Sequence, residues 1–219
     1  MDYRSPLRSI YVVIKTILSV IIFSISLSQA SAQTMRDVWL SMPDTLVPYL
    51  DEQNRVDMLD ALEVKDGTDV VGKLQETSHI DVLTSQFISV SLNESSTLQM
   101  RLLPSDADTL VCVVRTYFAP QAESEITFYN TKWENAVGSY IDTINQDVFF
   151  QRPESMSESR FSALVFIYKE CLLVRATLDA AEPRLLLRCS SPTITADEQK
   201  EFEPALVQIS LKWDGKTFN

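Results

Sequence analysis

The 219-residue sequence predicts an α+β protein in which an antiparallel β-meander sheet carries two or three flanking helices. Three patterns predict this class. Apolar residues recur at helical spacing from Asp51 to Val64, and from Asp69 to Thr131 they alternate with polar residues between turn sequences. Beyond residue 153, helical and strand-like patterns follow one another again. Taken together, the strand-like runs predict one antiparallel sheet of seven to nine strands.

The first 32 residues have the pattern of a secretory signal peptide. Arg4 and Arg8 precede an apolar run, and the small residues of "SQASA" end at Ala32, where signal peptidase is expected to cut. The run approaches the length of a membrane-spanning helix, but Lys15 and several serines interrupt it. We therefore expect a chain that starts near Gln33, is exported to the periplasm or the cell surface, and does not insert into the membrane after signal cleavage.

Residues 33–219 are expected to form a single α+β domain, and the less regular stretch 133–153 is where a weak subdivision would fall. A chain of this length buries enough surface to fold without a metal ion or a disulfide. The full sequence has a formal net charge of −11, and its acids are spread along the chain. Because such a chain repels phosphate backbones, we expect no nucleic-acid partner. The expected partner is a protein or a glycan.

The first elements are helical. Pro43 and Pro48 restrict the segment that contains them to short helical turns. A longer helix is predicted from Asp51 to Val64, and Gly67 is its expected stop. Within that helix Asp51 and Arg55 are four residues apart, so we expect them to pair on the surface.

Four runs predict the strands of the meander. "FISVSL" and "TLQMRLL" alternate apolar and polar residues, "TLVCVVRTYF" is apolar on both faces as a central strand is, and "EITFYNT" follows a turn. The last hairpin sends small or purely apolar side chains to one face, which suits a core: Leu110, Cys112, Val114, Phe118, Ile126 and Phe128. Its other face carries Tyr117, Arg115 and Tyr129, and Trp133 lies just beyond the strand.

Tyr117, Tyr129 and Trp133 are the predicted binding residues. Tyr and Trp are enriched where proteins bind one another, because each offers a large contact area with a polar handle. The alternative is that a helix over residues 155–169 covers this face, which would make these side chains part of the edge of the core.

The segment 155–169 fits two structures. Ser155 and Glu158 form a capping-box pattern before apolar residues at helical spacing, which favours a helix, whereas "ALVFIY" alone also suits a buried strand. A hairpin of "CLLVRATL" and "RLLLRCS", a helix that Thr195 caps and Pro204 ends, and a last strand "ALVQISLKW" follow.

The three cysteines, Cys112, Cys171 and Cys189, leave at least one thiol free. Cys171 and Cys189 lie directly opposite each other only if the loop of their hairpin has three residues, 179–181, and a loop one residue longer puts the two sulfurs on opposite faces. Whether they pair is therefore open.

No catalytic, metal-binding or cofactor-binding motif is present in the sequence. The four glycines are too far apart for a phosphate-binding loop, and a single histidine, His79, with widely spaced cysteines does not make the usual zinc site. Glycoside hydrolysis needs only two carboxylates, so an acid pair remains open. The acids closest together on one element, Asp57 and Asp60, point outward on the predicted helix. We expect no catalytic residues, no metal and no cofactor.

Four strings, "MPDTLVPYLDEQNRVDML", "VSLNESSTLQMRLLP", "VCVVRTYFAPQAESEITFYNTKW" and "LKWDGKTF", resemble in order a Bacteroidales-restricted family of exported proteins known only as a domain of unknown function. The resemblance implies a periplasmic or cell-surface location in a Gram-negative anaerobe, and it transfers no catalytic residue. We expect a non-catalytic binding or assembly module of the bacterial cell envelope. The alternatives are a small acid-pair hydrolase acting on glycans and an inhibitor or chaperone-like partner of another exported protein.

Overall fold

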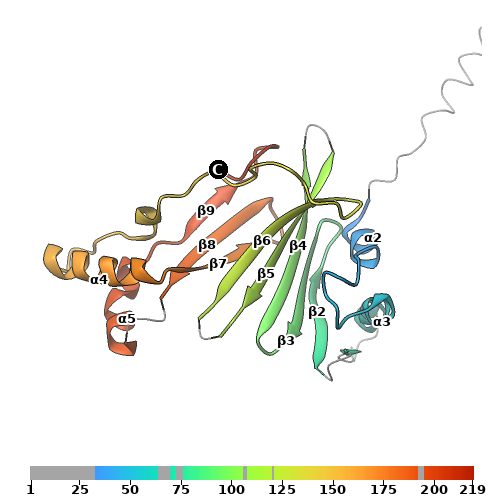
Figure 1. Ribbon diagram of the computed structural model, residues 1–219, viewed down its shortest axis with the longest axis horizontal. Coiled ribbons are helices and arrows are strands. Elements are labelled where there is room, and N and C mark those ends of the chain that lie inside the picture. The colour runs from blue at the N-terminus through green and yellow to red at the C-terminus, as the bar shows by residue number, and fades with distance from the viewer. Residues whose placement is uncertain (1–32, 64–69, 73–75, 106–107, 120, 192–194) are drawn as a thin grey trace, which may run out of the picture. The chain divides into compact units, whose positions relative to one another are not determined.

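The computed structural model describes residues 33–63, 70–72, 76–105, 108–119, 121–191 and 195–219. Residues 34–219 form one compact unit (Figure 1). The predicted signal peptide, residues 1–32, and the predicted helix stop at Gly67 lie outside the described residues. Among the described residues, no helix combines the length and the apolar character that crossing a membrane requires.

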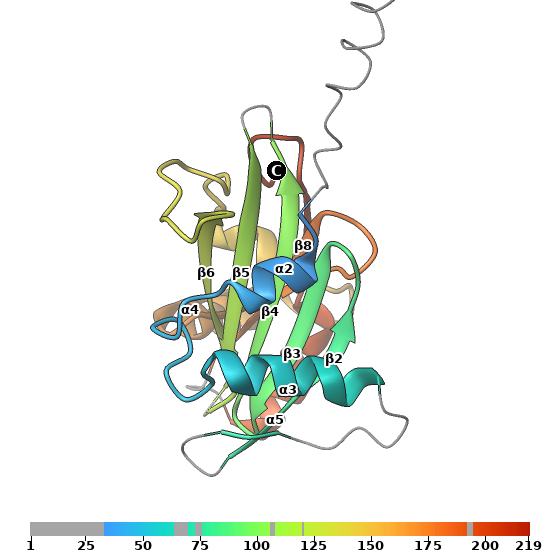
Figure 2. The same cartoon turned by 90° about the vertical axis from the view of Figure 1, so that its right-hand side faces the viewer.

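Two helices open the unit. α2 (Met35–Leu40) begins after Thr34, whose hydroxyl accepts a hydrogen bond from the Asp37 N–H while the Asp37 carboxylate accepts one from the Thr34 N–H. This reciprocal pair satisfies two N–H groups that the first helical turn leaves without partners. α3 (Glu52–Glu63) confirms the helix predicted from residues 51–64. Both helices lie across the same face of a β-sheet (Figure 2).

Arg55 is buried in α3, and its expected surface pair with Asp51 is wrong. Only 2% of its surface is exposed. Its Nη1 atom lies 2.9 Å from Oδ1 of Asp44 and 2.9 Å from the Leu50 carbonyl oxygen, and its Nη2 atom lies 2.6 Å from the Met42 carbonyl oxygen. The turns between α2 and α3 point these acceptors inward, and a guanidinium is the side chain with enough donors to satisfy them together.

A six-stranded antiparallel sheet follows, with its strands in sequence order. This confirms the predicted meander and the α+β class. Its strands are β1 (Val70–Val71), β2 (Thr77–Leu83), β3 (Phe87–Asn93), β4 (Ser96–Pro104), β5 (Thr109–Tyr117) and β6 (Glu123–Asn130).

The central strands of this sheet are buried on both faces, whereas on β2 the side chains of Thr77, His79 and Asp81 are exposed. β5 shows the arrangement: Val111 and Val113 pack in the cluster that contains α2 and α3, while Leu110, Cys112 and Val114 pack in a second cluster on the opposite face. The strand is therefore apolar on both faces, as predicted. The second cluster also takes Ile126 and Phe128, as predicted, whereas Phe118 lies outside it, beyond the end of β5, and its ring contacts Arg175.

The second half of the chain covers the second face. It contains η1 (Gln146–Phe149), α4 (Glu158–Glu170), β7 (Leu173–Leu178), β8 (Arg184–Ser190), α5 (Ala196–Phe202), η2 (Glu203–Ala205) and β9 (Ile209–Lys212). β7, β8 and β9 form a separate three-stranded sheet. It lies on the side of the large sheet away from α2 and α3 (Figure 1). The nine described strands thus divide between two sheets and do not form the single sheet that the sequence predicts, because β7 packs on the face of the large sheet and does not pair with its edge.

The outer edge of β7 meets the face of the large sheet. The Ala176 N–H donates to Oγ of Ser124 at 2.9 Å, and the Leu178 N–H donates to Oε1 of Gln99 at 2.9 Å. Nη2 of Arg101 also donates to the carbonyl oxygen of Ala181 at 3.2 Å. Side chains on the large sheet therefore take the place of a neighbouring strand, and the edge of β7 keeps its hydrogen bonds without joining that sheet.

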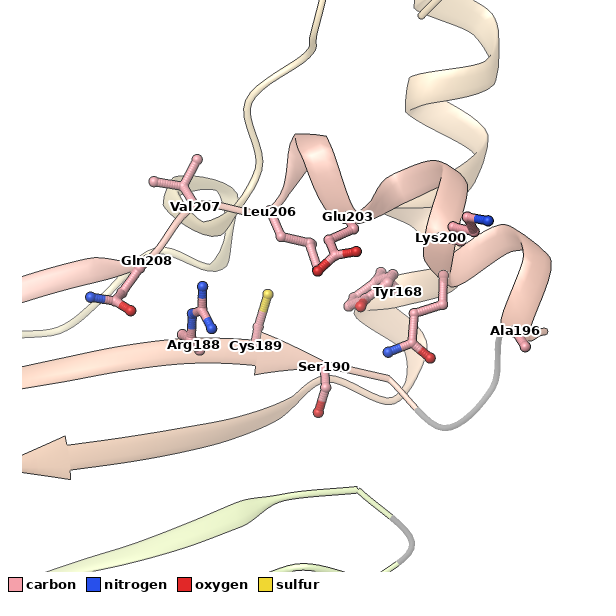
Figure 3. A pocket seen from close by; sticks show the side chains of 11 residues that line it. Tyr168, Arg188, Cys189, Ser190, Ala196, Lys200, Glu203, Leu206, Val207 and Gln208 are labelled. Carbon is pink, nitrogen blue, oxygen red and sulfur yellow. The ribbon is translucent and has the colours of Figure 1, made fainter.

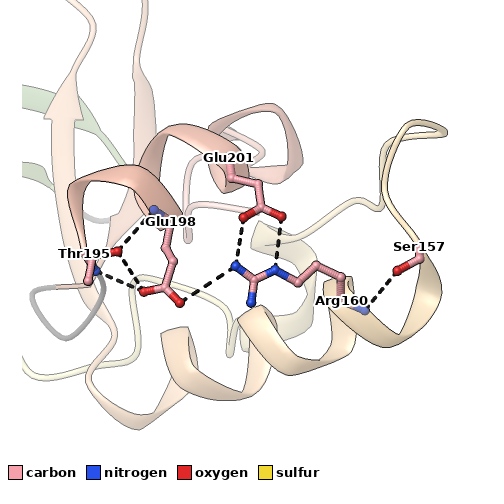
Figure 4. A network of polar contacts seen from close by, with 5 residues as sticks. All are labelled: Ser157, Arg160, Thr195, Glu198 and Glu201. Carbon is pink, nitrogen blue, oxygen red and sulfur yellow. Dashed lines mark hydrogen bonds and ion pairs between the residues drawn. The ribbon is translucent and has the colours of Figure 1, made fainter.

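α4 confirms the helical interpretation of residues 155–169, but its cap differs from the prediction. The helix starts after Ser157, whose hydroxyl accepts from the Arg160 N–H, and not after Ser155. The reason is a turn that precedes it, in which the Met156 N–H donates to the Pro153 carbonyl oxygen at 3.1 Å. Arg160 then reaches α5 and binds Glu201 with two donors, at 3.0 and 2.8 Å (Figure 4).

α5 begins as predicted, with the reciprocal hydrogen bonds of Thr195 and Glu198. The β7–β8 hairpin decides the question of the cysteines. Cys189 lies opposite Val174, so the loop is three residues longer than a Cys171–Cys189 pair would need. All three cysteines are free thiols.

Candidate functional site

The three predicted binding residues lie on one face of the large sheet but not at one place. Tyr129 is paired with Val111 and Tyr117 with Glu123, so the two tyrosines stand six residues apart along the hairpin, roughly 20 Å. Trp133 lies beside Tyr129, with 5.6 Å between the ring centroids and 54° between the ring planes. The structure therefore brings Tyr129 and Trp133 together and leaves Tyr117 at the far end of β5.

α4 does not cover this face. Its apolar residues pack in the cluster on the opposite side of the sheet, whereas Tyr129 and Trp133 pack against the cluster that contains α2 and α3. The alternative that a helix over 155–169 covers the patch is thus wrong. Both aromatic side chains are half-buried, Tyr117 is 47% exposed, and Nε1 of Trp133 donates to Oγ of Ser41 at 3.2 Å.

Trp133 occupies a strained turn. Its φ of +66° is the only positive value at a non-glycine residue in the described part of the chain. This left-handed backbone costs roughly 1–2 kcal/mol for an L-residue. The side chain of Asn130 holds the turn, because its Oδ1 accepts from the N–H groups of Lys132 at 2.9 Å and Glu134 at 3.0 Å. Such strain persists where the surroundings enforce it, and here it directs the indole toward Tyr129.

A cavity of about 170 Å³ adjoins Tyr129. Sheet residues form its floor and part of its rim, and the chain that follows α2 forms the rest of the rim. The lining residues are Met42, Thr45, Leu46, Leu98, Val113, Arg115, Glu125, Thr127 and Tyr129. We call Tyr129, Trp133 and this cavity the aromatic site.

The aromatic site has one cationic and one anionic wall. Arg115 and Glu125 are direct neighbours across β5 and β6. Arg115 donates from Nη2 to the carbonyl oxygen of Leu46, which holds the guanidinium at the rim. Its Nε is buried and has no hydrogen-bond partner among the described residues. The site therefore offers an apolar floor, a polar donor and a carboxylate within one small space.

A second cavity, of about 360 Å³, lies between β8 and α5–η2. Figure 3 shows the Cys189 thiol, the Glu203 carboxylate and the Tyr168 ring converging there. Burial raises the pKa of Cys189 to about 11, and burial, with smaller contributions from Cys189 and Glu203, raises the pKa of Tyr168 to about 12. Both groups are therefore protonated near neutral pH. Because the thiolate is the nucleophile, Cys189 lacks the form that cysteine catalysis uses.

Two acids meet at an open hollow of about 370 Å³ near the β3–β4 turn, where Glu76 and Glu94 line the surface with Thr77, Asn93 and Ser95. Both carboxylates are exposed. A catalytic acid stays protonated near neutral pH because burial or a close like charge raises its pKa. Exposed carboxylates lack the contribution from burial. Asp57 and Asp60 are exposed on α3, as predicted.

No three His, Cys, Asp or Glu side chains gather closely enough to hold a metal ion in the parts of the chain that the structure describes.

The fold is similar to that of a solved structure, a domain of an uncharacterized protein from Porphyromonas gingivalis W83, with a TM-score of 0.67. The alignment covers 83% of this chain and 96% of that one, at 21% sequence identity. At this identity the similarity shows that the two proteins share a fold, and nothing about function follows from it. No curated protein matches the sequence. The resemblance to a family of unknown function is confirmed by a family model that matches residues 27–218: the chain belongs to the family described as Protein of unknown function (DUF3256).

Proposed function

We propose that this chain is an exported, non-catalytic binding module of the bacterial cell envelope, and that it binds a protein partner through the aromatic site. The observation that carries the proposal is the Tyr129–Trp133 pair, which a strained turn holds beside a cavity that the guanidinium of Arg115 and the carboxylate of Glu125 help to line. Strain of this kind is kept where it serves a purpose, and it is tied to the aromatic residue itself.

The size of the cavity favours a protein segment. Sites for whole small molecules usually enclose at least about 300 Å³. A space of about 170 Å³ suits one inserted side chain. Arg115 and Glu125 at the rim then face the peptide groups on either side of that side chain. Arg115 can donate to a carbonyl oxygen of the partner, and Glu125 can accept from an N–H group of the partner.

A glycan fits the site less well. Sugar rings stack on a flat aromatic surface, but the planes of Tyr129 and Trp133 are inclined by 54° and both rings are half-buried. A buried aromatic anchor beside a polar rim is instead the pattern found at the centres of protein interfaces.

Export is supported by the N-terminal pattern of Arg4, Arg8, the apolar run and "SQASA". Thr34, which caps α2, follows this pattern directly, so a chain that begins near Gln33 retains that cap. N-terminal sequencing of the protein recovered from its native cells, together with fractionation of periplasm and outer surface, tests this part. A chain that keeps its first 32 residues in the cytoplasm contradicts it.

The binding test uses the mature chain, 33–219, immobilised and exposed to solubilised envelope proteins of its native cells. We expect a recurrent protein partner whose purified form binds at least about tenfold more weakly to Trp133→Ala and Tyr129→Ala, a loss typical of anchor residues. Tyr117→Ala is the matched control, since Tyr117 is on the same face but roughly 20 Å away.

Circular dichroism establishes that each variant is folded. A partner that all three variants bind equally refutes the role of the aromatic site, and binding that glycosidase treatment of the extract abolishes identifies a glycan instead.

A further inference from the structure

The outer face of the three-stranded sheet carries a charge arrangement that its own packing does not explain. Arg175 on β7 and Arg188 on β8 are direct cross-strand neighbours, and both are exposed. Like charges in this position repel each other and destabilise the sheet. Such a pair is more notable because the whole chain has a formal net charge of −11.

No carboxylate of the described residues lies within ion-pair distance of Arg175 or Arg188. A third arginine of this sheet shows the contrast. Arg184, at the start of the strand, binds Glu182 at 2.6 Å. Arg184 thus has an acidic partner, whereas Arg175 and Arg188 have none among the described residues.

The pair lines a cavity of about 210 Å³ whose polar members can all donate hydrogen bonds. Thr177, Leu186 and Gln208 complete the lining. No acidic side chain is among these residues. Figure 3 shows Arg188 and Gln208 side by side where β8 passes the chain that leads into β9.

Arg175 is held in position although its guanidinium donates no hydrogen bond to any of the residues that the structure describes. Its guanidinium carbon lies 5.3 Å from the centre of the Phe118 ring. A cation–π contact of this kind orients the planar group while its N–H groups stay available in the plane. A preoriented guanidinium loses less conformational entropy when it binds a ligand.

From this geometry we propose that the cavity of Arg175, Arg188, Thr177 and Gln208 binds a phosphate group. Two positive charges without a neighbouring acid are best neutralised by an anion with two negative charges. A phosphate monoester has a charge of about −1.5 to −2 at pH 7. Guanidinium groups bind its oxygens with paired hydrogen bonds. The cavity is smaller than the roughly 300 Å³ of sites for whole small molecules, so it receives the phosphate and leaves the rest of the ligand outside.

This site is independent of the aromatic site, which lies on the α2–α3 side of the large sheet. A phosphate site is also compatible with the expectation that this acidic chain does not bind nucleic acid. A short cluster of two arginines serves one phosphate group, whereas binding a nucleic-acid backbone depends on many neutralised phosphates.

Thermal unfolding of the mature chain in inorganic phosphate, compared with sodium chloride at equal ionic strength, is the first test. We expect phosphate to raise the melting temperature, because a ligand that binds only the folded state stabilises it. Arg175→Gln and Arg188→Gln each weaken the affinity by at least about tenfold, the effect of losing one charge-assisted contact. Lys212→Gln, on the same face but outside the cavity, leaves it unchanged within about twofold.

Two further readouts distinguish a phosphate site from general screening. The affinity for glycerol phosphate, a phosphate monoester, falls as the pH drops through about 6, where the monoester takes up a proton and loses a charge. Without phosphate, Arg188→Gln is at least as stable as the wild type, since the repulsion between the two arginines is gone. If a glutamine variant fails to fold, Arg188→Lys keeps the charge, loses the paired geometry, and binds phosphate more weakly.

Soluble and membrane sources of the phosphate are separated by titrating glycerol phosphate and by sedimenting the protein with phosphatidylcholine vesicles that contain or lack phosphatidic acid. Binding to glycerol phosphate alone indicates a soluble ligand, and co-sedimentation that needs phosphatidic acid and both arginines indicates a lipid headgroup. The proposal is overturned if phosphate stabilises the wild type no more than chloride does, or if Lys212→Gln weakens binding as much as Arg175→Gln.

Discussion

The two faces of the six-stranded sheet are covered by different means. On the face of α2 and α3, apolar side chains such as Trp39 and Met58 pack on the strands, and one buried guanidinium, Arg55, satisfies main-chain carbonyl groups of the turns between the helices. On the other face, side chains of the large sheet, Ser124 and Gln99, satisfy main-chain N–H groups of β7. On the first face a side chain donates hydrogen bonds to carbonyl groups of a loop, and on the second face side chains accept hydrogen bonds from N–H groups of a strand edge.

This difference shows how polar groups specify an arrangement that apolar packing only stabilises. Apolar side chains tolerate several alignments at similar cost. A buried N–H or carbonyl group does not, because a shifted alignment leaves it without a partner at a cost of about 1–3 kcal/mol. We therefore expect the effects of substitutions on the two faces to follow the number of main-chain groups that each side chain satisfies.

Arg55→Ala should be the most destabilising of these changes. It removes the donor that serves the carbonyl oxygens of Leu50 and Met42 and the carboxylate of Asp44, so we expect the free energy of unfolding to fall by about 3–5 kcal/mol. Urea denaturation measures it. Arg36→Ala, which removes a surface pair with Glu63, is the control and should cost less than about 1 kcal/mol. Equal losses in both variants would contradict the comparison.

Ser124→Ala should have an intermediate effect. It removes the acceptor of the Ala176 N–H at the edge of β7, and the expected loss is about 1–3 kcal/mol of unfolding free energy. Hydrogen exchange should also speed up at Ala176 more than at residues of β4 and β5. Ser210→Ala, on the exposed face of β9, is the matched control and should change stability by less than about 0.5 kcal/mol. Unchanged exchange at Ala176 would show that this bond does not hold the sheets together.

Glu201→Gln should have the smallest effect, and it should depend on pH. The two donors of Arg160 lower the pKa of Glu201 (Figure 4). A carboxyl group whose pKa is lower in the folded state stabilises the protein above its unfolded value of about 4.3, and this stabilisation is lost as the pH falls through the folded value. The difference in urea midpoint between wild type and Glu201→Gln should therefore be present near neutral pH and vanish in acid.

Glu154→Gln provides the control for that experiment, because Glu154 is exposed and lies outside the α4–α5 network. A difference between Glu201→Gln and the wild type that persists in acid would assign it to packing and not to the ion pair.

The local elements follow from the sequence because their causes are local. The reciprocal cap of Thr195 and Glu198 lies within one helical turn, and it starts α5 where the pattern predicts. The alternation of β3 and β4 and the doubly apolar β5 depend on neighbouring residues and short turns, so the meander was predictable too. The faces of the β5–β6 hairpin likewise follow from a period of two residues.

The candidate site was predictable only in part. Periodicity places Tyr117 and Tyr129 on one face, but their separation depends on the register of β5 and β6, which the length of the loop sets. The cavity beside Tyr129 is formed by the chain after α2, more than fifty residues away in sequence, where the rim residues Thr45 and Leu46 carry no local signal. A cation–cation pair such as Arg175 and Arg188 becomes visible only when the hairpin register is known.

The sequence by itself determined α3, the start of α5, the meander, the apolar faces and the family, because each depends on residues that are close along the chain or on strings that can be matched directly. The tertiary structure alone decided that β7 would bind the face of the large sheet through Ser124 and Gln99, that Arg55 would turn inward, and that Cys171 and Cys189 would lie out of register. The first depends on main-chain N–H groups that find side-chain partners far away in sequence, the second on the path of the turns between α2 and α3, and the third on the length of the β7–β8 loop. No local pattern in the sequence sets any of the three, because buried main-chain groups find their partners only when the layers pack.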